Sequence, residues 1–192
     1  MNSKGSRGIV TLLIESGVIE ASDRELYEYA IHSLWLLIAP LLLALVFGIL
    51  MGAPWKAVLM ILPFMAIRKF SGGFHAKHER TCLIVSSLLI MLCIYAAAHL
   101  EYGVVISICL MLAGISLIVF SPIDSEKRRL DDDEKIRYKV ITAVMATVFA
   151  VLHLILLVLG LRSAAVCIAV GLILSAGLQI PCVVMRMMKI EY

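Results

Sequence analysis

The chain has 192 residues, of which 62% are hydrophobic and 16% charged, and its formal net charge is +3 at pH 7. Its mean hydropathy of +1.02 is too high for an ordinary soluble domain. Residues 81–123 carry one charged side chain, Glu101, and residues 140–161 and 163–185 carry none. Uncharged stretches of about 18–22 residues are long enough to cross a hydrocarbon core of ~30 Å as helices. We therefore expect an integral membrane protein of the helical class.

The N-terminal region, residues 1–30, predicts two helices before the first membrane segment. The stretch KGSRGIVTLLIES has apolar residues at helical spacing behind Lys4 and Arg7. This amphipathic pattern fits a helix on the inner leaflet, and equally a helix that packs against the protein itself. Ser22 with Glu25 three positions later matches a capping box, so a second helix is expected to begin there and run into the membrane.

Six hydrophobic segments follow, at residues 32–51, 55–67, 82–100, 103–121, 140–161 and 164–185. The second has only about 13 residues, or roughly 20 Å as a helix, and it contains Lys56 and Pro63. It either tilts, lengthens into its flanks, or enters the membrane and returns. The expected fold is an all-α polytopic membrane protein in which residues 1–192 form a single membrane-embedded domain.

The basic residues predict the orientation of these segments. If all six cross and the N-terminus is cytoplasmic, fifteen Lys and Arg lie inside and two outside, Lys56 and Arg162. This places both termini, the loop 68–82 and the charged loop 122–139 at the cytoplasmic face. The predicted location is the cytoplasmic membrane, with several crossings.

The loop RKFSGGFHAKHERTC gathers reactive side chains between two apolar segments. Cys82 follows His75 by seven positions, and a histidine within hydrogen-bond reach can take a proton from a thiol. On one continuous helix the two residues would stand about 10.5 Å apart, too far for direct contact. The stretch from Ser71 to Gly73 favours a turn, which would let His75 fold back over a helix beginning near residues 79–81. Cys82 would then lie in its first turn, where helix N–H groups favour a thiolate.

Three other interpretations of the loop remain open on residue types alone. It could be a basic anchor that only sets the topology. It could bind a metal through His75, His78 and Cys82, although this set lacks a nearby fourth ligand and matches no common zinc spacing. The glycine pair with basic residues could bind phosphate, but no Lys-Ser/Thr partner accompanies it.

The same motif resembles the signature of the accessory gene regulator B family, bacterial membrane cysteine endopeptidases of quorum sensing. The family pattern has an arginine, a glycine pair, a His-Ala and a cysteine seven positions after that histidine, as in Arg68 to Cys82 here. The resemblance extends through DRELYEY and SPID…K…DDDEK, with Ser121 where alanine is expected. It implies a cysteine endopeptidase that removes the acidic C-terminal tail of a peptide precursor. Cys82 would form a thioester with His75 as base and acid, and the peptide would close to a thiolactone or lactone.

The remaining residues of the loop have expected supporting roles. Basic side chains could steer the acidic tail or only enforce topology. Gly72 and Gly73 are expected to make the bend, and His78 is the alternative base to His75. The basic residues in question are Arg68, Lys69, Lys77 and Arg80.

Other polar residues and partners are less defined by the sequence. Gln179, or an acidic residue of 126–134, could approach the pair as a third orienting group, although Gln179 also fits a helix–helix hydrogen bond. His153 lies deep in its segment with no evident partner. Small residues at 169, 171, 175 and 177 could support helix packing or a homodimer. We expect no metal, cofactor or nucleic acid partner, and the rival function is a small transporter or peptide exporter.

Overall fold

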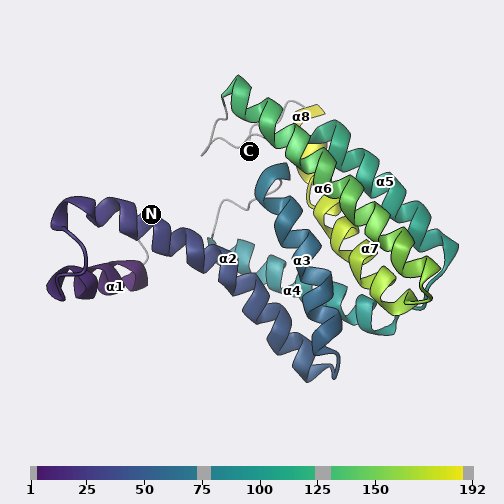
Figure 1. Cartoon of the computed structure of the whole chain (residues 1–192), viewed down its shortest axis with the longest axis horizontal. Helices are drawn as coiled ribbons and strands as arrows, with labels where there is room; N and C mark the ends of the chain where they lie inside the picture. The colour runs from purple at the N-terminus through teal and green to yellow at the C-terminus, as the bar shows by residue number, and fades with distance from the viewer. Residues whose placement is uncertain (1–3, 73–78, 124–130, 188–192) are drawn as a thin grey trace. The chain divides into compact units, whose positions relative to one another are not determined.

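The computed structural model describes residues 4–72, 79–123 and 131–187, and in these ranges it contains helices and no strand (Figure 1). The all-α class is thereby confirmed. The elements are α1 Lys4–Glu15, the 3₁₀ turn η1 Ala21–Asp23, α2 Arg24–Leu50, α3 Pro54–Ser71, α4 Glu79–His99, α5 Val104–Phe120, α6 Asp132–Val158, α7 Arg162–Gly177 and α8 Ile180–Met187.

The chain divides into two compact units, Met1–Leu42 and Leu43–Tyr192. The first contains α1, η1 and the start of α2, where Arg24 bonds Glu28 at 3.0 Å and Thr11 at 3.4 Å. The expected amphipathic helix is present as α1. The expected capping box is not formed, because the Ser22 hydroxyl donates to the Glu20 carboxylate and α2 begins two residues later.

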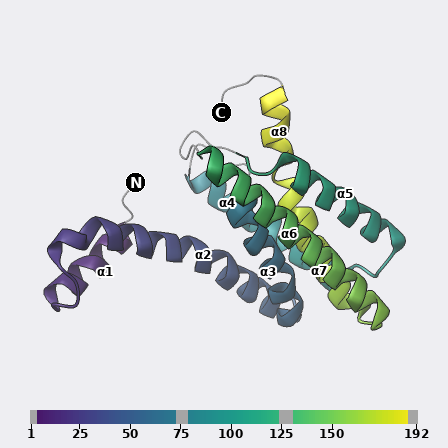
Figure 2. The ribbon, with the colours of Figure 1, turned by 45° about the horizontal axis from the view of Figure 1, so that its top comes forward.

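In the second unit α7 is the central helix, in contact with α3, α4, α5 and α6 (Figure 2). Every residue from 165 to 172 is buried, which requires neighbours to come close to its backbone. Gly171 permits one such approach, since a Cβ there would overlap the Met60 carbonyl oxygen of α3. The small residues of this segment thus serve packing within the chain.

Hydrogen bonds between helix ends fix the directions of the helices in this unit. The Lys56 ammonium, near the start of α3, donates to the Ala98 carbonyl near the end of α4 at 2.9 Å. At its other end α3 meets the residues that follow α5 and α7, through bonds among Ser71, Ser121 and Gln179. Helices α3, α5 and α7 therefore run parallel to one another, and α4 runs opposite to them. Helix α6 also runs opposite, since His153 near its end bonds Ser107 and Ala165 near the starts of α5 and α7. The second hydrophobic segment is a continuous helix of 18 residues that lengthens into its flank.

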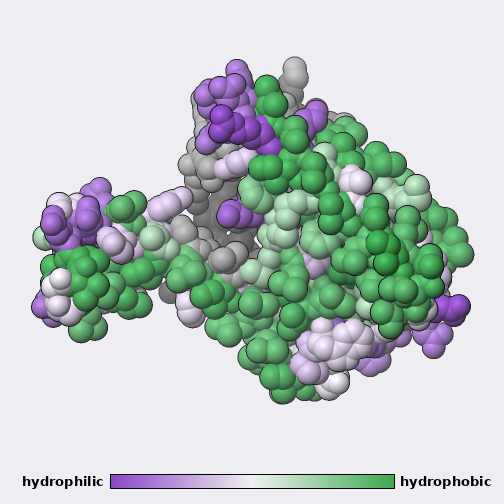
Figure 3. Space-filling view, in the orientation of Figure 1, coloured by the Kyte–Doolittle hydropathy of each residue, from purple (hydrophilic) through white to green (hydrophobic). Residues whose placement is uncertain are grey.

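The outer surface of this unit is apolar. Large side chains of α5 and α6 such as Met111, Ile115, Val144 and Leu154 are exposed, and Figure 3 shows a broad hydrophobic area over these helices with hydrophilic residues near their ends. Within the described ranges, Asp132–Val158 and Arg162–Met185 are long and apolar enough to cross a membrane, and shorter apolar helices accompany them. Exposed apolar surface of this extent is stable against lipid rather than water.

Candidate functional site

The structure describes only some of the predicted reactive residues. His75 lies outside the described residues, as do Gly73, Lys77 and His78. Cys82 and Arg80 are described by their backbone alone, in α4, which begins at Glu79. Since residues 73–78 lie outside the described residues, a helix beginning near residues 79–81 stays a prediction, and Cys82 lies in the first described turn of α4. Contact between His75 and Cys82 stays a prediction.

Gly72 ends α3 with a backbone conformation that other residues rarely adopt. Its φ is 69° and its ψ is −156°, a region that is essentially restricted to glycine. A Cβ at this position would stand 2.5 Å from the Ile123 carbonyl oxygen. The predicted conformational role of Gly72 is therefore supported by two separate features, the positive φ and the close approach of another segment.

The carbonyl groups of Ser71 and Gly72 accept several hydrogen bonds. The Ile123 amide donates to Ser71 O at 3.0 Å. The Arg68 guanidinium donates to Gly72 O at 2.7 Å, and the Ser71 hydroxyl is 3.2 Å from the same oxygen. Arg68 thus contacts the backbone at the start of the loop. Lys69 takes a different position, with Nζ 5.5 Å from the centre of the Phe70 ring.

Gln179 joins this group from the short gap between α7 and α8. Its side chain is fully buried. Its amide nitrogen donates to Ser121 Oγ at 2.7 Å and lies 3.4 Å from Ser71 O. Gln179 therefore forms a hydrogen bond between segments, as one of the two alternatives from the sequence predicted. Ser121 and Ile123 had no expected role at this site, since nothing in the local sequence pattern pairs them with residues near 71.

His153 lies in a second buried polar cluster, at the other end of α5 and α7. Its Nδ1 is 2.9 Å from the Ala165 carbonyl, and its Nε2 is 3.1 Å from Ser107 Oγ. Since a carbonyl can only accept, Nδ1 carries a proton, and in the neutral imidazole Nε2 accepts from the Ser107 hydroxyl. Tyr102 extends the chain with its hydroxyl 3.2 Å from Ser107 Oγ. The partners that the sequence did not reveal for His153 are therefore Ser107 and the Ala165 backbone.

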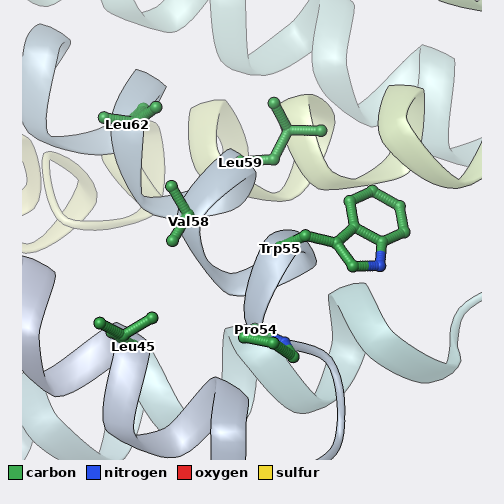
Figure 4. Close-up of a pocket in the computed structure, with 6 residues that line it drawn as sticks. All are labelled: Leu45, Pro54, Trp55, Val58, Leu59 and Leu62. Carbon is green, nitrogen blue, oxygen red and sulfur yellow. The ribbon is translucent and has the colours of Figure 1, made fainter.

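A hollow of about 410 Å³ lies between the end of α2 and the first half of α3 (Figure 4). Each of its lining side chains is apolar, so it offers no acid, base or nucleophile. The lining residues are Leu45, Pro54, Trp55, Val58, Leu59 and Leu62. Among the residues whose side chains are described, no group of three or more His, Cys, Asp and Glu lies close enough together to hold a metal ion.

Comparison with known proteins matches a family model described as AgrB, accessory gene regulator B, over residues 6–182. A protein of Clostridium perfringens strain 13 named as AgrB-like protein 2 is 22% identical over 121 residues, which are 58% of this chain and 56% of that protein. An AgrB-like protein of Clostridium perfringens strain SM101 is 21% identical over the same shares. The chain thus spans little more than half the length of these curated relatives. No solved structure matches it significantly.

Proposed function

Because the chain belongs to the accessory gene regulator B family, we propose that it is a membrane cysteine endopeptidase that processes a quorum-sensing peptide precursor. The observation that carries the proposal is the His75–Cys82 pair within the family motif, with His75 in the sequence between α3 and α4 and Cys82 in α4. Family membership and the two long apolar helices identify a membrane protein.

In this mechanism His75 takes the proton of the Cys82 thiol. The thiolate attacks the carbonyl carbon that joins the signal peptide to its acidic tail, and the tail amine leaves with the proton from His75. The product is a thioester between Cys82 and the peptide. A cysteine thiol or serine hydroxyl within the peptide then attacks the thioester, which closes the thiolactone or lactone ring and returns the Cys82 thiol. Unpaired N–H groups in the first turn of a helix favour both the thiolate and the developing oxyanion.

The proposed topology has six crossings with the loop 68–82 at the cytoplasmic face. The parallel directions of α3, α5 and α7 support it, because they put the ends of all three helices on one side. Lys56 and Arg162, the two basic residues predicted outside, lie near the starts of α3 and α7. Most of the basic residues would then face the anionic inner leaflet. A homodimer stays a prediction.

The test is co-expression of the chain with the short precursor peptide that we expect to be encoded beside it, followed by mass spectrometry of the peptide products. Wild type is expected to release the tail, whereas Cys82→Ala and His75→Ala are expected to release none. Cys93→Ala is the matched control, because it removes a thiol from the same helix about 16 Å further along its axis. His78→Ala should also retain cleavage.

A precursor whose internal nucleophile is replaced by alanine should trap the thioester. The peptide containing Cys82 would then carry the acyl group, and neutral hydroxylamine would release it. Full tail release by Cys82→Ala would overturn the proposal and favour the transporter or exporter function instead.

A further inference from the structure

Gln179 has an unusual position for an amide side chain. It is completely buried at the end of α7, in a molecule whose neighbouring surface is made for lipid. Burying an amide is unfavourable unless hydrogen bonds compensate for the lost solvation. Its nitrogen has two partners, but its oxygen Oε1 has none among the described residues. A leucine or methionine at this site would avoid the free-energy cost of burying that oxygen. The two bonds of the nitrogen are therefore the feature that distinguishes glutamine here.

The two bonds connect segments that are distant in the sequence. One partner, Ser121 Oγ, follows α5 and is 58 positions away, and the other, the Ser71 carbonyl, ends α3 and is 108 positions away. Ser71 and Ser121 are themselves buried. A single amide therefore holds the ends of three parallel helices in one register.

The bonded segments fix two consecutive carbonyl groups, those of Ser71 and Gly72, from several sides. Ser71 O accepts from the Ile123 amide as well as from Gln179. Gly72 O accepts from Arg68, and the Ile123 carbonyl lies where a Gly72 side chain would be. The orientations of the Ser71 and Gly72 carbonyl groups are thus determined by Gln179, by the segment after α5 and by α3 itself.

We propose that Gln179 is a positioning residue for the reaction at Cys82, acting through the backbone of Ser71 and Gly72. The proposal rests on the proposed function. His75 follows Gly72 by three positions, and three residues span at most about 11 Å. Fixing the direction of the chain at Gly72 therefore limits where the imidazole can lie relative to Cys82. Gln179 does not touch the reacting atoms in this role.

The experiment compares Gln179→Met, Ser121→Ala and the double variant in the full-length protein, purified in detergent. Methionine has a similar volume and no hydrogen-bond donor, so packing is kept and both bonds are lost. Ser175→Ala is the matched control. Ser175 is also fully buried on α7, one turn earlier, but its hydroxyl donates to Gly171 O within its own helix.

For Gln179→Met, kcat for tail removal is expected to fall about 10- to 100-fold with KM changed less than about threefold, because a displacement near 1 Å misaligns reacting groups while binding is kept. Ser121→Ala should lower kcat by about 3- to 10-fold, the value of one hydrogen bond. In the double variant the serine change should add nothing, since its partner is already absent. Ser175→Ala should keep the wild-type kcat.

A second measurement separates positioning from loss of structure. The rate at which iodoacetamide alkylates Cys82, followed by mass spectrometry over a pH series, reports how much of the thiol is thiolate. Gln179→Met should move this profile toward that of His75→Ala, whereas Ser175→Ala should leave it at wild type. A fall in kcat with an unchanged alkylation profile would overturn the positioning role.

Three other outcomes also decide the question. Wild-type kcat in Gln179→Met, or additive effects in the double variant, would overturn the role of Gln179 while Cys82→Ala remains inactive. Tail removal by Cys82→Ala would instead overturn the proposed function. If Gln179→Met does not fold, Ser121→Ala decides alone, and an unchanged kcat and alkylation profile in that variant would overturn the proposal.

Discussion

Two buried polar clusters lie at opposite ends of α5 and α7, and they differ in what they connect. The Gln179 cluster comprises Gln179, Ser121, Ile123, Ser71, Gly72 and Arg68, and the His153 cluster comprises His153, Ser107, Tyr102 and the Ala165 carbonyl. Along α7, Ala165 and Gln179 are about 21 Å apart, with an apolar core between them.

In the His153 cluster both ring nitrogens have partners, Ser107 and Ala165, and both partners belong to regular helices. In the Gln179 cluster the bonds involve the backbone of two segments that follow helices, at Ser71 and Ile123. Gly72 has a conformation that other residues avoid, and the buried Gln179 Oε1 lacks a partner in the described structure. Strain and unpaired polar groups are typical of sites selected for function rather than stability. We therefore expect changes in the His153 cluster to affect stability, and changes in the Gln179 cluster to affect the reaction.

The largest effect is expected from Gly72→Ala. The glycine-only backbone region costs an alanine about 1–3 kcal/mol, and the contact with Ile123 O adds to this cost. Tail removal should fall by about 100-fold or more, because the chain leading to His75 must shift. The measurement is the cleavage assay together with thermal unfolding in detergent.

Gly160→Ala is the matched control for that change. Gly160 also has a positive φ, 76°, but a Cβ there would meet no atom within 4 Å, and it lies near the His153 cluster between α6 and α7. It should lose about 1–2 kcal/mol of stability and keep its activity. Equal losses of activity in the two alanine variants would remove the distinction between the clusters.

An intermediate effect is expected from His153→Leu. The change removes two hydrogen bonds, so that Ser107 Oγ and Ala165 O lose their partner on His153. This should lower the free energy of unfolding by about 1–3 kcal/mol. Because the site is remote from Cys82, kcat of the folded protein should stay within about twofold of wild type. A clear loss of kcat without a change in unfolding would show that this end of the bundle also serves the reaction.

The smallest effect is expected from Tyr102→Phe. It removes one terminal bond, from the tyrosine hydroxyl to Ser107 Oγ, and keeps the ring beside His153. The expected loss is about 0.5–1.5 kcal/mol, with no change in activity. Thermal unfolding of Tyr102→Phe and His153→Leu, alone and together, would measure how strongly the members of the cluster depend on one another.

Much of the fold could be predicted from the sequence, because apolar segments of a given length identify helices with little ambiguity. The long apolar helices α5, α6 and α7 correspond to predicted hydrophobic segments. The start of α6 at Asp132 was missed, since the charges of 132–139 indicated a loop. Asp131 with Glu134 three positions later forms a capping box, and this pattern could have located it.

The contacts of the two polar clusters could not be predicted in the same way. Ser107 and His153 are 46 positions apart, and the partners of Gln179 are more distant still. Hydrogen bonds over such separations depend on how the helices pack against one another. This packing cannot be predicted from the local hydrophobic pattern of the sequence. Ser121 illustrates the limit: the sequence marked it only as a departure from the family pattern, whereas it accepts the shortest bond of Gln179.

The central position of α7 has a consequence for how the molecule is made. A ribosome releases α3, α5 and α6 before α7, yet each of them packs against α7. In the proposed topology, these helices would therefore enter the bilayer before their main neighbour, α7, is present. Under the proposed function, a chain that stops before α7 would carry Cys82 without the Gln179 contacts that are proposed to position the loop.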